Sequence, residues 1–358
     1  MKALWWILGA VAVAIVAYLA LLMIPVSGAL QTLDQKLVEQ CRRVDVFPGT
    51  EDVTIDPEFN IGIVSADDRR AAFAGNPVPG GIYAFNVDQP ELIVKISPEG
   101  LNDFHPHGLS LWRGPGEKRL FVINHASDGE KVEIFILGPD GMLTHSETIA
   151  FPEMHSPNDI LAVGPRSFYA TNDHKYDGGL MGTLEAYFAL PFASVVYFDG
   201  TKGGFAAKGL VYANGINQSP DGKTVYVSEF LKRRIDLFDR DPETGALTKR
   251  GQYSVNTNPD NIEIAADGGI WVAGHPRVFD FLRHVKKPDH PAPSHVLRVN
   301  ARTGEGKEFF VDTTGKLNAS SVGAVWDKTL IVGSVFDTHV MVCPMVKIFL
   351  ENAGGEPQ

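Results

Sequence analysis

The sequence predicts an all-β fold, a six-bladed β-propeller, which follows an apolar N-terminal helix. A short polar segment that leads into an apolar strand recurs six times, and a second apolar run follows most of these segments at a similar distance. The 36 Gly and 23 Pro residues indicate many tight turns rather than long helices. We therefore expect one propeller domain at 31–350, between a helix at 1–30 and a short tail at 351–358.

The first predicted element is a signal anchor or transmembrane helix. Ala3 to Val26 carry no charged side chain and follow Lys2, and at about 1.5 Å per residue such a helix spans a hydrocarbon layer of ~30 Å. The small residues Ser27-Gly28-Ala29 leave a cleaved signal peptide open as the alternative. The positive-inside tendency keeps Lys2 cytoplasmic. Either interpretation places the propeller in the lumen or outside the cell, membrane-anchored or secreted.

The chain has two cysteines, Cys41 and Cys343, which bracket the folded region. In an oxidising compartment they predict one disulfide that fastens the first element of the ring to the last. Closing so long a loop stabilises a fold by roughly 5 kcal/mol in the chain-entropy model. Two free buried thiols are the alternative.

The six recurring segments place polar side chains at the same position of each expected innermost strand. Their first residues lie 46 to 60 residues apart, in or just beyond the period of four-stranded propeller blades. The segments are Glu51-Asp52-Val53, His107-Gly108-Leu109, Asn158-Asp159-Ile160, Asn214-Gly215-Ile216, Asp260-Asn261-Ile262 and Ser320-Ser321-Val322. Ring closure would gather these side chains at one end of a central channel. The alternative is that each Asn or Asp caps a strand or turn locally.

The second apolar runs are the expected second strands of the blades. They are 120–123, 167–170, 224–227, 270–272 and 330–332. Turn residues such as Pro139-Asp140-Gly141, Pro220-Asp221-Gly222 and Ala266-Asp267-Gly268 fit hairpin connections. Residues 177–198 fall outside the repeat and are rich in Leu, Met, Tyr and Phe. They predict either an amphipathic helix that lies on a membrane or over the channel mouth, or core structure.

Charge and motifs exclude several classes of function. The net charge is −11 and the longest run of Lys or Arg is the three residues Lys232–Arg234, so nucleic acid is not an expected partner. The sequence also has no Gly-x-Ser-x-Gly elbow, no Walker-type or dinucleotide-binding glycine motif, and no Cys/His cluster with zinc spacing.

The recurring segments are rich in oxygen donors, and this predicts calcium. Calcium takes six to eight oxygen ligands and accepts Asn carbonyls among them. The candidate side chains are Glu51, Asp52, Asn158, Asp159, Asn214, Asp260 and Asn261. Because adjacent donors occur at three of the segments, two ions are expected.

Two histidines are the catalytic candidates. His107 occupies the ring position of the second segment, and His125 follows at the end of the next strand. A histidine pair beside a Lewis-acidic ion can activate water for attack on an ester carbonyl. The alternative is that each histidine is structural.

Two glycosylation sequons are present, Asn217-Gln218-Ser219 and Asn318-Ala319-Ser320. The first precedes Pro220 and lies beside the predicted metal ring. We therefore expect Asn318 to be the acceptor if either is used.

A series of motifs in order resembles the paraoxonase family of serum arylesterases. The motifs are GTEDV (49–53), NDFHPHG (102–108), VINH (122–125), NDILAVGP (158–165), FYATNDH (168–174), ANGINQSPDG (213–222) and DNI (260–262). The resemblance covers residues 41–343 and includes a cysteine at each end. It implies a calcium-dependent hydrolase of lactones and aryl esters that keeps an uncleaved hydrophobic N-terminus.

The resemblance also implies a role for each candidate residue. It implies a catalytic calcium bound by Glu51, Asn158, Asn214, Asp260 and Asn261. It implies a deeper structural calcium bound by Asp52, Asp159 and the carbonyl of Leu109. His107 would be the general base, assisted by His125, with calcium and Asn158 stabilising the oxyanion.

The sequence departs from the family at positions that bear on specificity. Many paraoxonases carry a free Cys before a His-Pro pair, where this chain has Gly274 before His275. The segments 71–81 and 278–293 do not match closely, and such loops shape the pocket of a propeller. Two alternatives follow: a hydrolase of sugar lactones of the gluconolactonase type, and a non-catalytic, membrane-anchored binding propeller.

Overall fold

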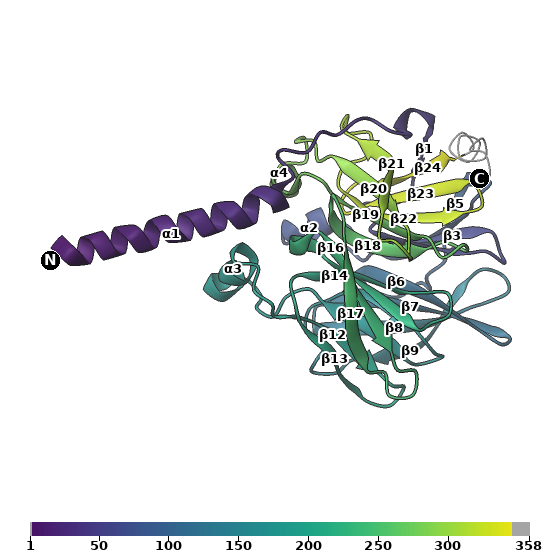
Figure 1. The fold of residues 1–358 in the computed structure, drawn as a ribbon. Helices are drawn as coiled ribbons and strands as arrows, with labels where there is room; N and C mark the ends of the chain where they lie inside the picture. The colour runs from purple at the N-terminus through teal and green to yellow at the C-terminus, as the bar shows by residue number, and fades with distance from the viewer. Residues whose placement is uncertain (1, 346–358) are drawn as a thin grey trace, which may run out of the picture.

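The computed structural model describes residues 2–345, and these form six four-stranded antiparallel sheets and a long helix that projects from one side (Figure 1). Five of the six sheets are built from four strands that follow one another in the sequence. The predicted six-bladed β-propeller is confirmed. The predicted tail at 351–358 lies outside the described residues.

Each blade is named here by its strands in sheet order. The first three are β2–β5 (Asp52–Asp56, Ile61–Ala66, Gly81–Asn86, Gln89–Lys95), β6–β9 (Pro106–Gly114, Glu117–Ala126, Gly129–Leu137, Leu143–Ile149) and β10–β13 (Pro157–Ala162, Phe168–Asn172, Ala193–Phe198, Gly203–Leu210). The next two are β14–β17 (Ala213–Gln218, Thr224–Glu229, Arg234–Arg240, Leu247–Ser254) and β18–β21 (Asn258–Ile264, Ile270–His275, Ser294–Val299, Gly306–Asp312). The sixth joins β22, β23 and β24 (Ser320–Trp326, Thr329–Ser334, His339–Pro344) to β1 (Arg42–Asp45).

The recurring segments of the sequence lie on the innermost strands. Contacts between β2, β6, β10, β14, β18 and β22 run from each strand to the next and back to β2, so these strands surround the axis. Two glycines permit the close approach of neighbours. A Cβ atom on Gly108 would lie 2.6 Å from the carbonyl oxygen of Asn158, and one on Gly215 would lie 2.5 Å from that of Asp260. The predicted common phase is confirmed for five segments, since equivalent register shifts and hydrogen bonds place them alike on their strands. The sixth segment is offset by one residue, so that Ser321 rather than Ser320 is in phase with Asn158.

The hydrophobic core lies between neighbouring blades. Phe121 and Ile134 of the second blade pack against Phe168 and Phe198 of the third, and similar clusters fill the other junctions. Middle strands are buried on both faces, which explains the nearly continuous apolar runs predicted as second strands.

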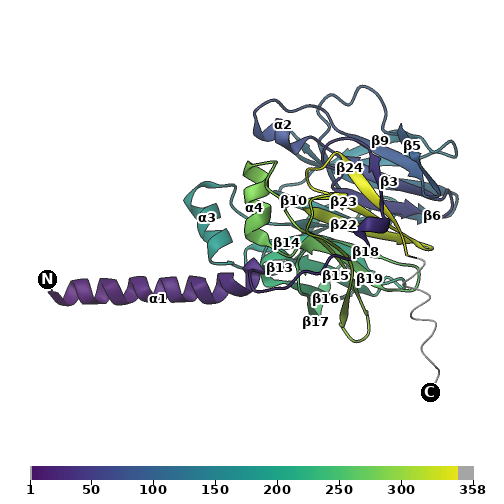
Figure 2. The ribbon, with the colours of Figure 1, turned by 90° about the horizontal axis from the view of Figure 1, so that it is seen from above.

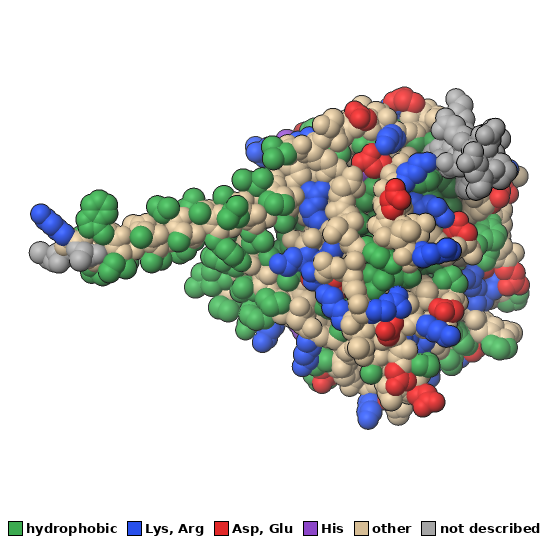
Figure 3. Space-filling view, viewed as in Figure 1, with side chains coloured by type: hydrophobic (Ala, Val, Ile, Leu, Met, Phe, Trp, Pro, Cys, Tyr) green, Lys and Arg blue, Asp and Glu red, His purple; other side chains and the backbone are tan. Residues whose placement is uncertain are grey.

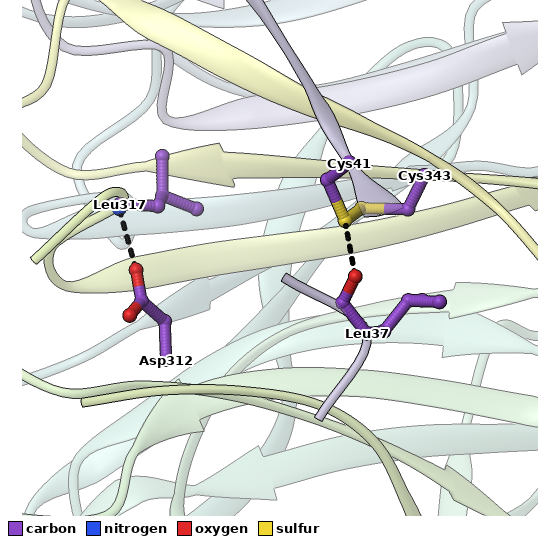
Figure 4. Close-up of a disulfide and its surroundings, with 5 residues drawn as sticks. All are labelled: Leu37, Cys41, Asp312, Leu317 and Cys343. Atoms are coloured by element: carbon purple, nitrogen blue, oxygen red, sulfur yellow. Dashed lines mark hydrogen bonds between the residues drawn. A yellow bond between two sulfur atoms is a disulfide. The ribbon is translucent and has the colours of Figure 1, made fainter. Parts of the chain in front are cut away.

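The two ends of the folded region close the ring together. β1 pairs with β24, with Arg42 opposite Val342, and a disulfide joins Cys41 to Cys343 beside this pairing (Figure 4). The predicted disulfide is confirmed. Nearby, the N–H of Leu317 donates to Asp312 at 2.7 Å, which orders the loop before the sixth blade.

The helices gather at one end of the propeller. The α-helices are α1 (Lys2–Ser27), α2 (Arg69–Phe73), α3 (Gly179–Tyr187) and α4 (Val278–Lys286), and the 3₁₀ helices are η1 (Val38–Gln40) and η2 (Phe230–Lys232). α2, α3 and α4 each connect the second strand of a blade to the third. In an antiparallel blade this connection lies at the end where the innermost strand begins. α1 lies on the same side, and Figure 2 shows it beside α3 and α4.

The end of α1 packs on the propeller. Val26 is buried in a cluster with Phe230 and Val278. Gly28 has a φ of 65°, and a Cβ atom there would lie 1.7 Å from the carbonyl oxygen of Pro276, so the chain passes very close to the fifth blade. Before this junction, exposed hydrophobic side chains cover α1 (Figure 3), and the stretch Leu4–Ser27 is long and apolar enough to cross a membrane.

The segment 177–198 divides into two parts. Its first part forms α3, which exposes Leu180, Met181 and Tyr187. Its last part is strand β12, which is buried in the third blade. The segment is therefore part helix and part core strand, and the position of α3 on a membrane or over the channel mouth stays a prediction.

Candidate active site

Four side-chain oxygens lie unpaired at the end of the channel where the innermost strands begin. They are Oε2 of Glu51 and Oδ1 of Asn158, Asn214 and Asn261, all buried and all without a hydrogen-bond partner within residues 2–345. Buried polar atoms are normally hydrogen-bonded. Unpaired oxygens on four strands around one axis are the donor set of a hard cation. These residues therefore fit calcium.

Hydrogen bonds hold this oxygen ring in place. The Nδ2 of Asn261 donates to Oε1 of Glu51 at 3.2 Å, which links β18 across the axis to the start of β2. The Nε2 of His275 donates to Oδ2 of Asp260 at 2.9 Å, and both side chains are buried. Asn158 and Asn214 lie on β10 and β14, which are neighbours in the ring.

Asp52 and Asp159 link neighbouring innermost strands. Oδ2 of Asp52 accepts from the N–H of Leu109 at 2.8 Å, and Oδ2 of Asp159 accepts from the N–H of Ile216 at 2.7 Å. Burial raises the pKa of both carboxyls well above the ordinary range, and so does a neighbouring carboxylate, Glu51 for Asp52 and Asp52 for Asp159. These two carboxylates need positive charge nearby to remain ionised.

The ring is not a cluster of acidic and histidine ligands alone. No group of three or more His, Cys, Asp or Glu among the described residues is arranged to hold a metal ion. Asn carbonyls complete the set instead, as calcium allows and as zinc does not favour.

Glu51 is the most strongly ionised member of the ring. Burial acts to raise its pKa, but the nearby positive charges of His107 and Arg69 and the amide of Asn261 outweigh burial and lower the pKa to about 2. The Nε2 of His107 lies 3.5 Å from Oε2 of Glu51, and the NH2 nitrogen of Arg69 lies 4.0 Å from the same oxygen.

The two predicted histidines meet beside the ring. Nδ1 of His107 lies 2.7 Å from Nε2 of His125, and their rings are 74° apart. Nδ1 of His125 lies 2.6 Å from Oε2 of Glu130. The result is a hydrogen-bonded chain from Glu130 through both histidines toward Glu51.

A half-buried histidine, His174, lies in a second polar cluster near His107. The hydroxyl of Ser156 lies 2.9 Å from Nδ1 of His174, which also forms an ion pair with Asp173, and Nε2 of His174 lies 2.7 Å from Asp177. The hydrogen bond with Asp173 is the main reason that the pKa of His174 is raised to about 9. This histidine is a cation at neutral pH.

A family model described as arylesterase matches residues 70–345, which is most of the chain. The chain belongs to the arylesterase family. It is similar to serum paraoxonase/arylesterase 2 of Rattus norvegicus, with 33% identity over 83% of this chain and 86% of that protein. It is also similar to serum paraoxonase/arylesterase 1 of Homo sapiens, with 32% identity over 86% of this chain and 90% of that protein.

Solved structures support the fold of this arylesterase-family chain. A structure described as that of a putative gluconolactonase aligns with a TM-score of 0.56 at 18% identity, covering 85% of this chain and 91% of its own. A luciferin-regenerating enzyme aligns with a TM-score of 0.54 at 16% identity, covering 87% and 95%. At such identities the likeness establishes the propeller architecture.

Sequence analysis did not identify Glu130, the pairing of His275 with Asp260, or Arg69. A signal for Glu130 was present, because a tight turn after Ala126 sets the register of β7 and β8 and puts His125 directly opposite Glu130. Arg69 lies in α2, outside the recurring segments, so the sequence does not predict that its side chain is directed toward Glu51. Its closeness to Glu51 depends on how the loops fold over the ring.

The missing cysteine of this arylesterase-family chain has a steric explanation. A Cβ atom on Gly274 would lie 2.2 Å from the carbonyl oxygen of Asn258 and 2.9 Å from the hydroxyl of Thr257. The neighbouring strand therefore occupies the space that a cysteine side chain would need.

The predicted glycosylation site is engaged in the fold. Nδ2 of Asn318 donates to the carbonyl of Gly315 at 3.4 Å, its Oδ1 accepts from the N–H of Ala292 at 3.1 Å, and Ser320 is fully buried. Glycosylation at Asn318 stays a prediction, and these contacts require it to precede folding of this loop.

Proposed function

We propose that the protein is a calcium-dependent hydrolase of lactones and aryl esters. Membership of the arylesterase family supports hydrolysis of esters. The observation that carries the proposal is the ring of unpaired buried oxygens directly beside a hydrogen-bonded histidine pair. Cation ligands and a general base are thus adjacent.

Two calcium ions would occupy the channel. The upper ion would be held by Glu51, Asn158, Asn214, Asp260 and Asn261, and the deeper ion by Asp52, Asp159 and the carbonyl of Leu109. When bound, calcium polarises an ester carbonyl and offsets negative charge that develops on its oxygen. The deeper ion would neutralise the two carboxylates, whose pKa values are raised by burial and by neighbouring carboxylates.

The hydrogen bonds of the histidine pair define its tautomers. The ionised carboxylate of Glu130 only accepts hydrogen bonds, so Nδ1 of His125 donates to it. Nε2 of His125 then accepts from Nδ1 of His107. With both histidines neutral, Nε2 of His107 carries no proton and faces Glu51. This state would require calcium in the ring, since without the ion the positive charge of His107 is what lowers the pKa of Glu51.

His107 would therefore act as the general base. Its Nε2 takes a proton from water as the water oxygen attacks the ester or lactone carbonyl carbon. The proton on Nδ1 can then pass to Nε2 of His125 across 2.7 Å, and Glu130 stabilises the charge that results. The amide of Asn158 would donate to the oxygen that becomes negative.

We also propose that α1 is an uncleaved membrane anchor and that the propeller lies in the lumen or outside the cell. Arg233 donates to the carbonyl of Pro25 at 2.9 Å, and Arg277 donates to the carbonyl of Gln31 at 2.8 Å. With the burial of Val26, these contacts make the end of α1 part of the folded domain. Cleavage after Ala29 would remove the contacts of Pro25 and Val26.

A substrate panel tests the proposed reaction. The full chain in detergent is given phenyl acetate, an aliphatic δ-lactone and a sugar lactone, first with calcium and then with excess EDTA. Calcium-dependent turnover of phenyl acetate or the aliphatic lactone supports the proposal. Turnover of the sugar lactone alone would indicate the gluconolactonase-type alternative, and no turnover by folded, calcium-loaded protein would indicate a binding propeller.

A further inference from the structure

Arg69 places a buried cation at the edge of the oxygen ring. It is the first residue of α2, and only 12% of its side chain is exposed. Its NH2 nitrogen lies 4.0 Å from Oε2 of Glu51, the oxygen that is also 3.5 Å from Nε2 of His107. The guanidinium and the proposed general base therefore face the same point of the site.

The two terminal nitrogens of Arg69 have different surroundings. NH1 donates to the carbonyl oxygens of Gly49, Asp67 and Val335 at 3.3 to 3.5 Å, which ties three loops together. NH2 is buried and has no hydrogen-bond partner in the part of the chain that the structure describes. One nitrogen thus anchors the side chain, and the other is directed to the site without a partner.

The neighbouring carboxylates do not neutralise Arg69. Asp67 pairs with Nδ1 of His105 at 2.9 Å, and Asp68 accepts from the N–H of Ala71 at 2.9 Å as the cap of α2. Glu51 is the remaining carboxylate near NH2, and it is one of the proposed calcium ligands. Once a divalent cation shares Glu51, the guanidinium is left as uncompensated buried charge, which is costly unless an anion meets it.

We propose that Arg69 is a specificity-determining residue that binds a carboxylate group of the substrate. This inference rests on the proposed hydrolase function and names a substrate class for it: esters or lactones that carry an acidic group near the scissile bond. The planar guanidinium suits a carboxylate, and a buried charge-assisted hydrogen bond of this kind favours the anionic substrate strongly.

The same geometry predicts an opposite effect on calcium. A guanidinium 4.0 Å from a calcium ligand repels a cation bound to that ligand. Removing the charge should therefore weaken carboxylate binding and strengthen calcium binding. A purely structural role for Arg69 would weaken both, because loss of the three carbonyl contacts would loosen the loops around the ring.

The test compares Arg69→Gln with Arg70→Gln in the full chain. Arg70 is a matched control on the same short helix. It lies over the aromatic side chain of Phe336 and donates to the carbonyls of His284 and Val285, so it does not face the oxygen ring. The substrates are phenyl acetate and the monoanion of monophenyl succinate, which share the leaving group. Calcium affinity and succinate binding to calcium-loaded protein are measured by calorimetry.

We expect Arg69→Gln to lower the ratio of kcat/KM for monophenyl succinate to kcat/KM for phenyl acetate by about tenfold or more, mainly through KM. Succinate binding should weaken and calcium binding should tighten, while Arg70→Gln changes none of these. Equal losses for both esters, or unchanged succinate binding, would overturn the inference. If the wild type hydrolyses neither ester, the proposed function fails, and the two binding measurements still decide the role of Arg69.

Discussion

Nδ1 of His107 lies 2.7 Å from Nε2 of His125, and Glu130 holds the far nitrogen of His125 at 2.6 Å. These three side chains come from β6, β7 and β8, consecutive strands of one blade. The histidine pair is therefore oriented by a single sheet. Its distance from the oxygen ring depends on how that blade packs against the other innermost strands.

The histidine pair gives the first prediction. His107→Gln should lower kcat for phenyl acetate by about 10²- to 10⁴-fold, because it removes the proposed general base. His125→Gln and Glu130→Gln should cause smaller losses, since each acts through His107. Steady-state kinetics on protein of verified calcium content measure the effect. Unchanged turnover in His107→Gln would exclude this histidine as the base.

The disulfide gives a prediction about stability. Replacing both Cys41 and Cys343 by Ser should lower the free energy of unfolding by about 2–5 kcal/mol, because the ends of the ring are then held by the β1–β24 pairing alone. Urea denaturation with calcium present measures the change. Denatured, unreduced wild-type protein should show no reactive thiol, and two reactive thiols would contradict the bridge.

His174 gives a prediction about pH. Its pKa is raised to about 9 in the folded protein from an ordinary value of 6.5. A raised pKa means that the protonated form stabilises the fold fully below pH about 6.5, and that this contribution is lost as pH rises through about 9. His174→Gln should therefore destabilise the protein at pH 6 more than at pH 9.5. Equal destabilisation at both pH values in urea would show that charge is not the cause.

The junction at Gly28 gives a prediction about the anchor. Because Val26 and Gly28 pack on the propeller, the N-terminal helix should remain on the mature protein. Mass spectrometry of protein purified from membranes should find residues 4–27 still attached. A mature N-terminus near Leu30 would contradict this. The double variant Arg233→Ala/Arg277→Ala should retain the anchor and lose stability, because it removes the guanidinium donors to the carbonyls of Pro25 and Gln31.

Repetition explains how far sequence analysis reached. Five of the six polar segments share one phase, so ring closure alone predicts that Glu51, Asn158 and Asp260 meet at one end of the channel. His107 belongs to the same series, and His125 follows from strand periodicity. The two cysteines predict the closure of the ring separately, because they lie at the two ends of the folded region.

The contacts of residues outside the repeat could not be predicted from the sequence. Arg69 and the packing of Val26 depend on loops whose course no period defines, and the exclusion of a side chain at Gly274 depends on backbone atoms of a neighbouring strand. Glu130 was within reach, since hairpin register alone places it opposite His125. In a propeller, the sequence repeat therefore predicts the residues of the innermost strands, but it does not predict the loop residues that determine substrate preference.

The central claim is that cation binding to the oxygen ring makes the histidine pair catalytic. The most direct test is a calcium titration of EDTA-stripped full-length protein, with phenyl acetate hydrolysis and bound calcium measured in the same samples, for the wild type and for Asn214→Ala, which lacks one of the unpaired oxygens. We predict that hydrolysis rises with bound calcium to a plateau in the wild type and that Asn214→Ala requires more calcium. Full hydrolysis by metal-free wild-type protein would contradict the account.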